Sequence, residues 1–243
     1  MITLSGSMSR PTARPEPASG FAIAALTASG IAVVALIAAA ALLGRSVSPV
    51  TWYVARASGM TLYLLLWGAA ITGLGMTTGL IDRWGGRGVI FSLHAFTTQL
   101  SYAFLTLHLL SLAADPTVRF GPAALLVPFA AGVREPWTGL GVLAGELTIL
   151  IGVSVALKPL IGQPAWRALH WLTFPLYALA LLHGLGAGTD SRTPWALALY
   201  LVTGAAVVLF SLYRLLRGGQ RRSSPPARTP ALTTRSAHAH PDQ

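Results

Sequence analysis

Apolar residues in this chain gather in long stretches rather than in the alternating patterns of soluble helices or strands. A helix that crosses a membrane needs about 20 consecutive, predominantly apolar residues. Six stretches are long enough, and we predict that each forms one spanning helix. They are approximately Phe21–Leu43, Thr51–Leu74, Val89–Ala113, Leu140–Ile161, Ala165–Ala187 and Trp195–Leu216. The pattern predicts an all-α, polytopic membrane protein built as a bundle of six transmembrane helices.

The segments outside these stretches divide the chain. Residues 1–20 are polar and contain three prolines, so they are predicted to be a disordered leader. Residues 21–49 then hold the first helix and its link, and residues 50–216 hold the main transmembrane domain. Residues 217–243 are rich in Arg, Ser, Pro and Thr and are predicted to be a disordered basic tail. The apolar stretch 121–132 is too short to span, so it is expected at the membrane interface or as a re-entrant lid.

Composition supports a membrane protein, and the charges predict its orientation. Of the 243 residues, 53% are hydrophobic and 10% are charged, against about 25% charged in an average soluble domain. A soluble enzyme would lack polar residues to cover its surface. A nucleic-acid-binding protein would explain the net charge of +10 but not the apolar mass. With both termini on one side, twelve basic residues lie there and five opposite, which predicts cytoplasmic termini in a bacterial plasma membrane.

Four histidines lie inside the predicted spanning helices, where ionisable residues are costly and are therefore functional candidates. His94 and His108 are on the third predicted helix, and His170 and His183 are on the fifth. Their spacings of 14 and 13 residues correspond to a rise of about 20 Å along each helix. Because both helices cross in the same direction, each of two depths receives two facing imidazoles. Bis-histidine ligation of haem requires this arrangement.

Other interpretations of these histidines remain open. Each can be an ordinary interhelical hydrogen-bond donor. A zinc or copper site is less favoured, because ligands about 20 Å apart on one helix cannot share an ion, and no cysteine is present to add thiolates. On an ideal helix, the interval from His170 leaves His183 about 140° away around the axis. Pro175 lies between them and is expected to kink or rewind the helix.

Three other charged residues are candidates because of their depth. Arg56 and Glu146 are expected near the depth of the outer histidine pair. Glu146 can pair with Arg56, bond the second nitrogen of a ligand histidine or relay a proton, or it can make a simple interhelical hydrogen bond. Arg167 stands one turn before His170 and can hold a carboxylate of an inner cofactor. The positive-inside rule explains Arg167 equally well.

Four motifs within residues 50–216 carry a family resemblance. They are WYVARASG at 52–59, the pair His94 and His108, WRALHW at 166–171 and LHGLGAGTD at 182–190. In them the chain resembles the ferric reductase-like transmembrane domain family. That family includes the membrane parts of ferric-chelate reductases and NADPH oxidases, and the haem subunit of the bacterial methionine sulfoxide reductase system.

The resemblance implies two b-type haems stacked between the third and fifth helices. The inner haem would be held by His94 and His170, and the outer haem by His108 and His183. Arg56 matches an arginine that lies beside the outer haem in this family, where a guanidinium can bind a propionate. The spacings alone also place two histidines at each depth, in agreement with this pairing.

The resemblance also implies a function as an oxidoreductase component in transmembrane electron transfer. The segment after Leu216, residues 217–243, is too short for the flavin or nicotinamide domain of longer relatives. A separate cytoplasmic-side donor is therefore expected, either a flavin reductase or membrane quinol. The outer acceptor would be a ferric chelate or a periplasmic redox partner, the other partner is membrane lipid, and nucleic acid is not expected. The alternative is a haem-free transporter or assembly factor that uses the histidines as interhelical hydrogen bonds.

Overall fold

The computed structural model describes residues 48–79, 86–118 and 120–223, and all regular structure within them is helical. Its helices are α2 (Ser48–Thr78), α3 (Gly86–Ala113), α4 (Pro122–Leu126), α5 (Trp137–His170), α6 (Thr173–Ala187) and α7 (Pro194–Ser223). The predicted all-α class is confirmed for these residues. The predicted leader, the first predicted span and most of the predicted tail lie outside the described residues.

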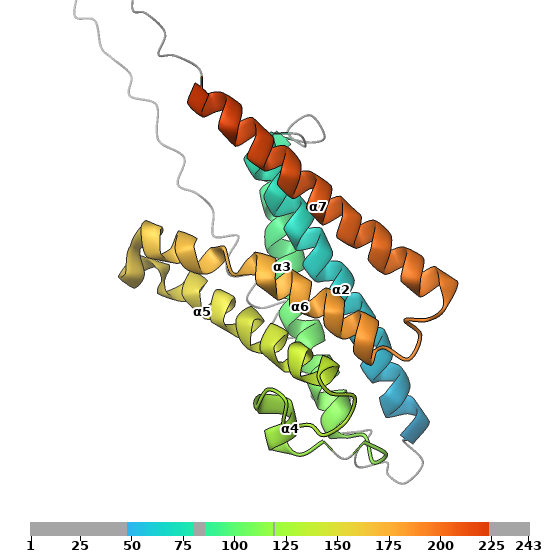
Figure 1. Cartoon of the computed structure of the whole chain (residues 1–243). Coiled ribbons are helices and arrows are strands. Elements are labelled where there is room, and N and C mark those ends of the chain that lie inside the picture. Colours follow the sequence, from blue (N-terminus) through green and yellow to red (C-terminus); the bar gives the residue numbers. More distant parts are fainter. Residues whose placement is uncertain (1–47, 80–85, 119, 224–243) are drawn as a thin grey trace, which may run out of the picture.

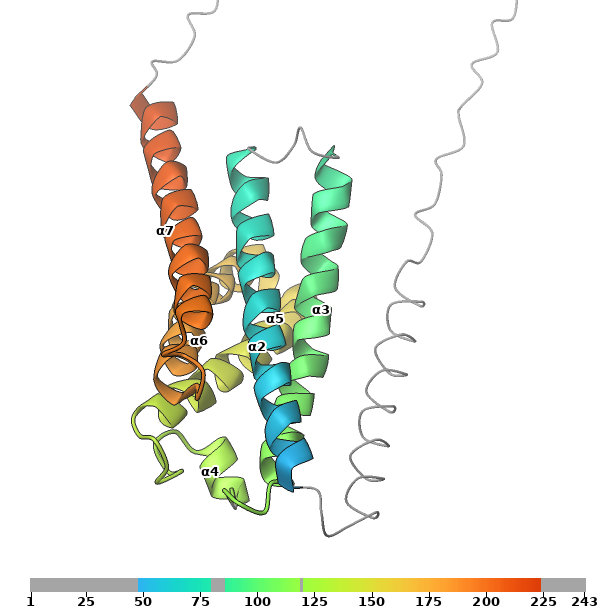
Figure 2. The same ribbon diagram turned by 90° about the vertical axis from the view of Figure 1, so that its right-hand side faces the viewer.

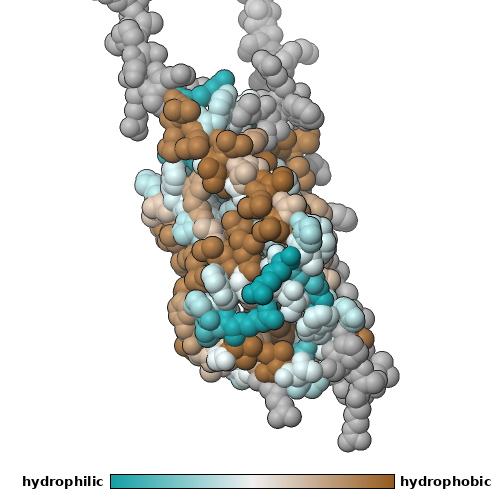
Figure 3. Space-filling model, turned by 45° about the vertical axis from the view of Figure 1, so that its right-hand side comes forward, coloured by the Kyte–Doolittle hydropathy of each residue, from teal (hydrophilic) through white to brown (hydrophobic). Residues whose placement is uncertain are grey.

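Three of these helices are long and apolar enough to cross a membrane: Val50–Thr78, Trp137–His170 and Pro194–Arg217. They correspond to the second, fourth and sixth predicted spans. Much of their apolar surface is exposed. On α7, for example, Leu201 is 62% exposed, Val202 67% and Leu209 64%. Hydrophobic residues also cover much of the face shown in Figure 3. Such a contiguous apolar surface is typical of a membrane-facing region. The length and composition of these three helices indicate a membrane protein.

The other two predicted spans in the described region have a different form. α3 covers the third predicted span with 28 residues, but side chains such as Thr97 and Gln99 make it more polar than the three apolar helices. The fifth predicted span, Ala165–Ala187, is divided between the end of α5 and α6, which has 15 residues. A turn at Trp171–Leu172 separates them. The distortion expected near Pro175 occurs here, because a proline ring clashes with the carbonyl four residues before it.

Helix α5 is bent at Gly162, where the chain reverses direction. Gly162 has φ 78° and ψ 166°, a backbone conformation that glycine adopts without the steric cost that a Cβ would bring. The bend divides α5 into a long arm, 137–161, and a short arm, 163–170. The short arm and α6 return alongside the long arm as a helical hairpin (Figure 1). This reversal brings both histidines of the fifth predicted span back toward α3.

The helices form a row backed by this hairpin. α2 lies between α3 and α7 (Figure 2), and the α5–α6 hairpin crosses the row, with α6 against α2. The main core lies where α2, α6 and α7 meet. Its buried members are Tyr63, Leu74, Tyr177, Ala196, Tyr200 and Val207. This core fixes α2 and α6, two of the helices that build the candidate site.

A buried hydroxyl network ties these three helices together at mid-depth. The Tyr63 hydroxyl is 2.9 Å from the Tyr177 hydroxyl and 2.5 Å from Thr203 Oγ1. The rings of Tyr63 and Tyr177 are stacked, with centres 5.8 Å apart. Because hydroxyl bonds are directional, the network fixes how α6 and α7 are rotated against α2.

Replacing Tyr63 with phenylalanine is expected to destabilise the bundle by about 1 kcal/mol. The change leaves the Tyr177 and Thr203 hydroxyls without this partner, and an interhelical hydrogen bond in a membrane averages about 0.6 kcal/mol. The measurement is thermal unfolding in detergent. Tyr53→Phe is the control, because Tyr53 is 61% exposed and makes no hydrogen bond within the described residues. Equal unfolding temperatures for the two variants would contradict a stabilising role of the network.

Helix α7 continues to Ser223, past residue 217, where composition placed the start of the disordered tail. The Arg217 guanidinium donates to the carbonyl of Thr78 at 3.4 Å and lies 4.9 Å from the Tyr213 ring centre. These contacts stabilise the last apolar turn against α2. The last helix therefore includes residues 217–223, the first residues of the segment predicted as a tail.

Candidate functional site

The four histidines of the predicted spans lie in two pairs. The ring centres of His94 and His170 are 6.3 Å apart, and those of His108 and His183 are 6.4 Å apart. The ring planes are inclined by 74° and 78°. No Cα atom of α3 lies within 8 Å of one in α6, so the second pair bridges two backbones that do not pack directly. These are the two pairs expected from the matched sequence spacings.

Three of the four imidazoles have one ring nitrogen held by a main-chain carbonyl of a neighbouring helix. The contacts are His94 Nδ1 with Ala69 at 2.9 Å, His108 Nδ1 with Ala55 at 2.8 Å and His183 Nδ1 with Trp137 at 2.9 Å. A carbonyl only accepts, so Nδ1 carries the proton and Nε2 keeps a free lone pair. This is the tautomer that a metal ligand needs, with its second nitrogen supported as in many metal sites.

The same three rings lie directly against glycines. A Cβ added at Gly59, Gly73 or Gly141 would meet a ring atom of His108, His94 or His183 at 2.9, 3.4 or 2.5 Å, respectively. Real side chains do not approach below 3.0 Å, so positions 59 and 141 require glycine for these rings to stay in place. We call each combination a glycine seat: a carbonyl acceptor followed four residues later by the glycine.

The two glycine seats on α2 repeat with the spacing of the histidines on α3. Ala55 lies 14 residues before Ala69, and Gly59 lies 14 residues before Gly73. The same interval separates the two histidines of α3. α2 and α3 run antiparallel and side by side (Figure 2), so equal intervals keep both rings in register. Sequence reasoning missed these residues as part of the site. The detectable signal was the pattern Ala-x-x-x-Gly, repeated at the histidine interval.

His170 has a different environment from the other three. Its Nδ1 is buried and has no hydrogen-bond partner among the described residues. Its ring stacks on Trp166, with centres 5.1 Å apart and planes at 23°. The Lys158 ammonium lies 4.2 Å from the Trp166 ring centre. His170 is thus packed against an aromatic ring, with a cation near that ring, where the other three histidines contact a carbonyl and a glycine.

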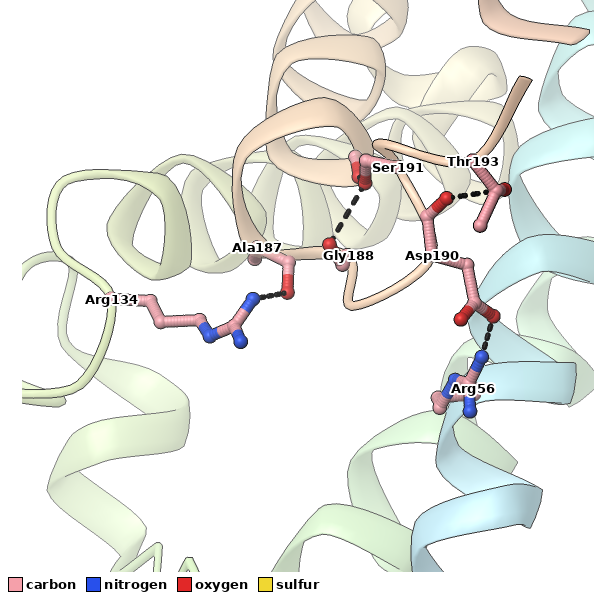
Figure 4. A network of polar contacts seen from close by, with 8 residues as sticks. Arg56, Arg134, Ala187, Gly188, Asp190, Ser191 and Thr193 are labelled. Carbon is pink, nitrogen blue, oxygen red and sulfur yellow. Dashed lines mark hydrogen bonds and ion pairs between the residues drawn. The ribbon is translucent and has the colours of Figure 1, made fainter. Parts of the chain in front are cut away.

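Arg56 forms an ion pair with Asp190 in the loop after α6 (Figure 4). Its guanidinium also lies 4.1 Å from the Trp52 ring centre. The two charged side chains are 29% and 36% exposed. The ion pair is made through Nη2 of the guanidinium, and a guanidinium has five N–H donors, so it can bind a second anion as well. Asp190 is a partner of Arg56 that the sequence did not predict.

The loop that carries Asp190 is held from a second direction. Arg134 Nη1 donates to the carbonyl of Ala187, the last residue of α6, at 2.9 Å (Figure 4). The Ser191 hydroxyl donates to the carbonyls of Gly184 and Gly188 at 2.6 and 2.9 Å. The Gly184 carbonyl also accepts the Gly188 N–H at 3.1 Å, whereas the carbonyl of Ala187 is among those that the last turn of a helix leaves without a helical partner. These bonds fix the end of the helix just beyond His183.

The other two charged candidates are both on α5. Glu146 and Arg167 are exposed, and neither makes a hydrogen bond or ion pair within the part of the chain that the structure describes. Two of the roles considered for Glu146 are therefore filled by other groups. Asp190 pairs with Arg56, and carbonyls bond the second nitrogens of His108 and His183.

Asp115 joins α2 to the loop after α3, at the end of the bundle near His108. Its carboxylate accepts hydrogen bonds from the Thr51 hydroxyl at 3.3 Å and from the Thr117 backbone N–H at 2.8 Å. Burial alone raises the pKa of Asp115, but its hydrogen bonds lower that pKa by more, so the net shift is downward. The ionised carboxylate thus stabilises the folded state.

Acidification is expected to weaken this link. Because folding lowers the pKa of Asp115, the stabilisation is complete above the unfolded value of about 3.9. It is lost as pH falls through the lower, folded pKa. In Asp115→Asn this part of the pH dependence should be absent, which unfolding in detergent between pH 7 and pH 3 would measure. An unchanged pH profile in the variant would show that other carboxylates control acid unfolding.

Each histidine pair supplies only two protein ligands. No group of three or more His, Cys, Asp or Glu side chains able to hold a metal ion is found within residues 48–79, 86–118 and 120–223. The pairs can therefore bind a metal only if its other ligands come from elsewhere. In comparisons with known proteins, no family model, curated protein or solved structure matches the chain.

Proposed function

We propose that the chain is the membrane component of an oxidoreductase and carries electrons through two haem groups. One is held by His94 and His170, and the other by His108 and His183. The ring spacing carries this proposal. With metal–imidazole bonds of about 2.0–2.1 Å and ring centres about 1.1 Å from the bonding nitrogen, two imidazoles on opposite sides of one ion have centres about 6.3 Å apart. The two pairs have centres 6.3 and 6.4 Å apart.

The ligand number favours haem over a bare metal ion. A tetrahedral zinc site needs three or four protein ligands, whereas haem brings four ring nitrogens and leaves two axial positions for histidines. Haem iron, when bound, supplies reversible one-electron chemistry. The motifs shared with the ferric reductase-like transmembrane family support the b-type form and the stacked arrangement in a six-helix bundle.

The residues around the pairs would orient and insulate the two haems. The carbonyls that bond Nδ1 fix the orientation of each ring and raise the basicity of Nε2. The glycines of the seats let these rings lie close to the helix backbone. Arg56 has guanidinium nitrogens left to bind a haem propionate while it pairs with Asp190. Tyr177, about midway between His170 and His183 in the sequence, lies at the depth between the two proposed haems.

The proposed direction runs from the cytoplasmic side to the outer side. Lys158 lies over the Trp166 ring that stacks on His170, and Arg214 lies over the ring of Trp171, the next residue. The positive-inside rule assigns this end, near His94 and His170, to the cytoplasm together with both termini. A separate flavin reductase or membrane quinol would supply electrons there. The acceptor at the other end would be a ferric chelate or a periplasmic redox partner.

A haem-free transporter or assembly factor remains the second candidate. The three carbonyl bonds of the histidines join neighbouring helices, as expected if they only stabilise helix packing. In that function, however, nothing requires the rings to meet in pairs at the spacing of a shared metal ion.

Haem content decides between the two functions. The full chain is purified in detergent, and a pyridine haemochrome assay and a reduced-minus-oxidised spectrum are recorded. We expect two haems for each chain, with the absorbance of bis-histidine b-type sites. Absence of haem from protein expressed with an ample haem supply would overturn the proposal and favour the second candidate.

A further inference from the structure

We propose that His170 is the exchangeable ligand of the inner pair, so that the inner site alone admits a small neutral ligand such as carbon monoxide. This inference rests on the haem-binding function proposed above. It concerns a difference between the inner and outer sites that neither the family resemblance nor the spacing of the histidines predicts. The evidence is the contrast between His170 and the other three histidines.

His170 lacks the support that the other ligands share. The other three donate Nδ1–H to a carbonyl within 2.9 Å and rest against a glycine. The Nδ1 of His170 is buried without a partner among the described residues. Its ring is stacked on that of Trp166, with centres 5.1 Å apart.

The sequence explains why His170 has no glycine seat. The seat of His183 is on α5, at Trp137 and Gly141. His170 lies 13 residues before His183 in the sequence. Because α5 and α6 pack antiparallel, the glycine of a matching seat for His170 would lie 13 residues after Gly141. That position is Ser154. Ser154 is 2% exposed, and its hydroxyl bonds its own helix at Ile151.

The missing partner weakens His170 as a ligand. Binding through Nε2 places the proton on Nδ1, which in His170 is buried with no acceptor among residues 48–79, 86–118 and 120–223. Partners of this kind change metal affinity by about 10–100-fold. With haem bound, His170 would release iron from its Nε2 as the carbon of carbon monoxide takes the same position. No electron would be transferred, and His170 would stay neutral.

Carbon monoxide binding to the reduced protein tests the proposal. The full chain in detergent is reduced with dithionite and titrated with carbon monoxide, and the haem spectrum is recorded. We expect half of the haem to change its spectrum. The change should persist in His108→Ala/His183→Ala, which keeps the inner site, and be absent from His94→Ala/His170→Ala. Binding at both sites, at neither site or only at the outer site would overturn the proposal.

A tryptophan pair tests the remaining support of His170. Trp166→Ala removes the stacked ring, so the carbon monoxide dissociation constant is expected to fall by about tenfold. Trp171→Ala is the control, because Trp171 is 50% exposed and stacks on Phe174 rather than on a histidine. Equal affinities in the two variants would overturn the assignment to His170. If Trp166→Ala fails to fold, the fraction of haem that binds carbon monoxide in the unmodified chain still tests the proposal. A chain without haem would instead contradict the proposed function.

Discussion

Replacing His108 with alanine is expected to remove one haem of two and to leave the other. An alanine offers no axial ligand, and the ring spacing of 6.4 Å leaves His183 alone on its side of the outer site. The inner pair, His94 on α3 and His170 at the end of α5, keeps both of its ligands. A pyridine haemochrome assay should fall from two haems for each chain to one. The remaining absorbance should keep the form of a bis-histidine site.

Combined substitutions distinguish paired ligands from independent histidines. If His108 and His183 hold one haem, the double variant His108→Ala/His183→Ala should lose no more haem than either single variant, because residues that act as a unit are not additive. His94→Ala/His108→Ala removes one ligand from each pair and should lose both haems. Equal losses in the two double variants would contradict the pairing. Wild-type haem content in every single variant would contradict ligation by these histidines.

The pairing of the histidines was accessible from the sequence, but their orientation was not. Two nearly equal intervals on helices of the same direction predict two depths. The 13-residue interval, however, would place His183 about 140° away from His170 around the axis of an ideal helix. The turn at Trp171–Leu172 and the reversal at Gly162 change the phase. A proline predicts that a distortion occurs nearby, but the size and direction of the rotation depend on packing against other helices.

The supports of the histidines were harder to predict because they are backbone atoms and missing side chains. A search for chemically active side chains cannot find a carbonyl of Ala55 or Ala69, since every residue has one. It also assigns Gly59 and Gly73 only to close packing. Their role becomes visible when the interval between the two glycines on α2 is compared with that between the histidines on α3. Asp190 was hidden for another reason, because its distance from Arg56 depends on how the loop after α6 folds.

The glycine seat of His183 allows a test in which no ligand is removed. In Gly141→Ala, the new Cβ would lie 2.5 Å from Nδ1 of His183 and 2.6 Å from its Cε1. The ring must move, which breaks its hydrogen bond to the Trp137 carbonyl and takes Nε2 away from the shared axis with His108. A misplaced ligand of this kind should lose the outer haem. We expect one haem for each chain and a spectrum that matches His183→Ala.

Gly145→Ala is the matched control, one helical turn further along α5. A Cβ there would meet only Leu105 Cδ1, at 3.8 Å, an ordinary contact. Alanine favours a helix over glycine by about 1 kcal/mol at either position, so helix propensity cannot explain a loss confined to Gly141→Ala. Haem loss in both variants would indicate general damage to α5. Two haems in Gly141→Ala would show that His183 does not bind from its glycine seat, and the axial arrangement proposed for the outer pair would be wrong.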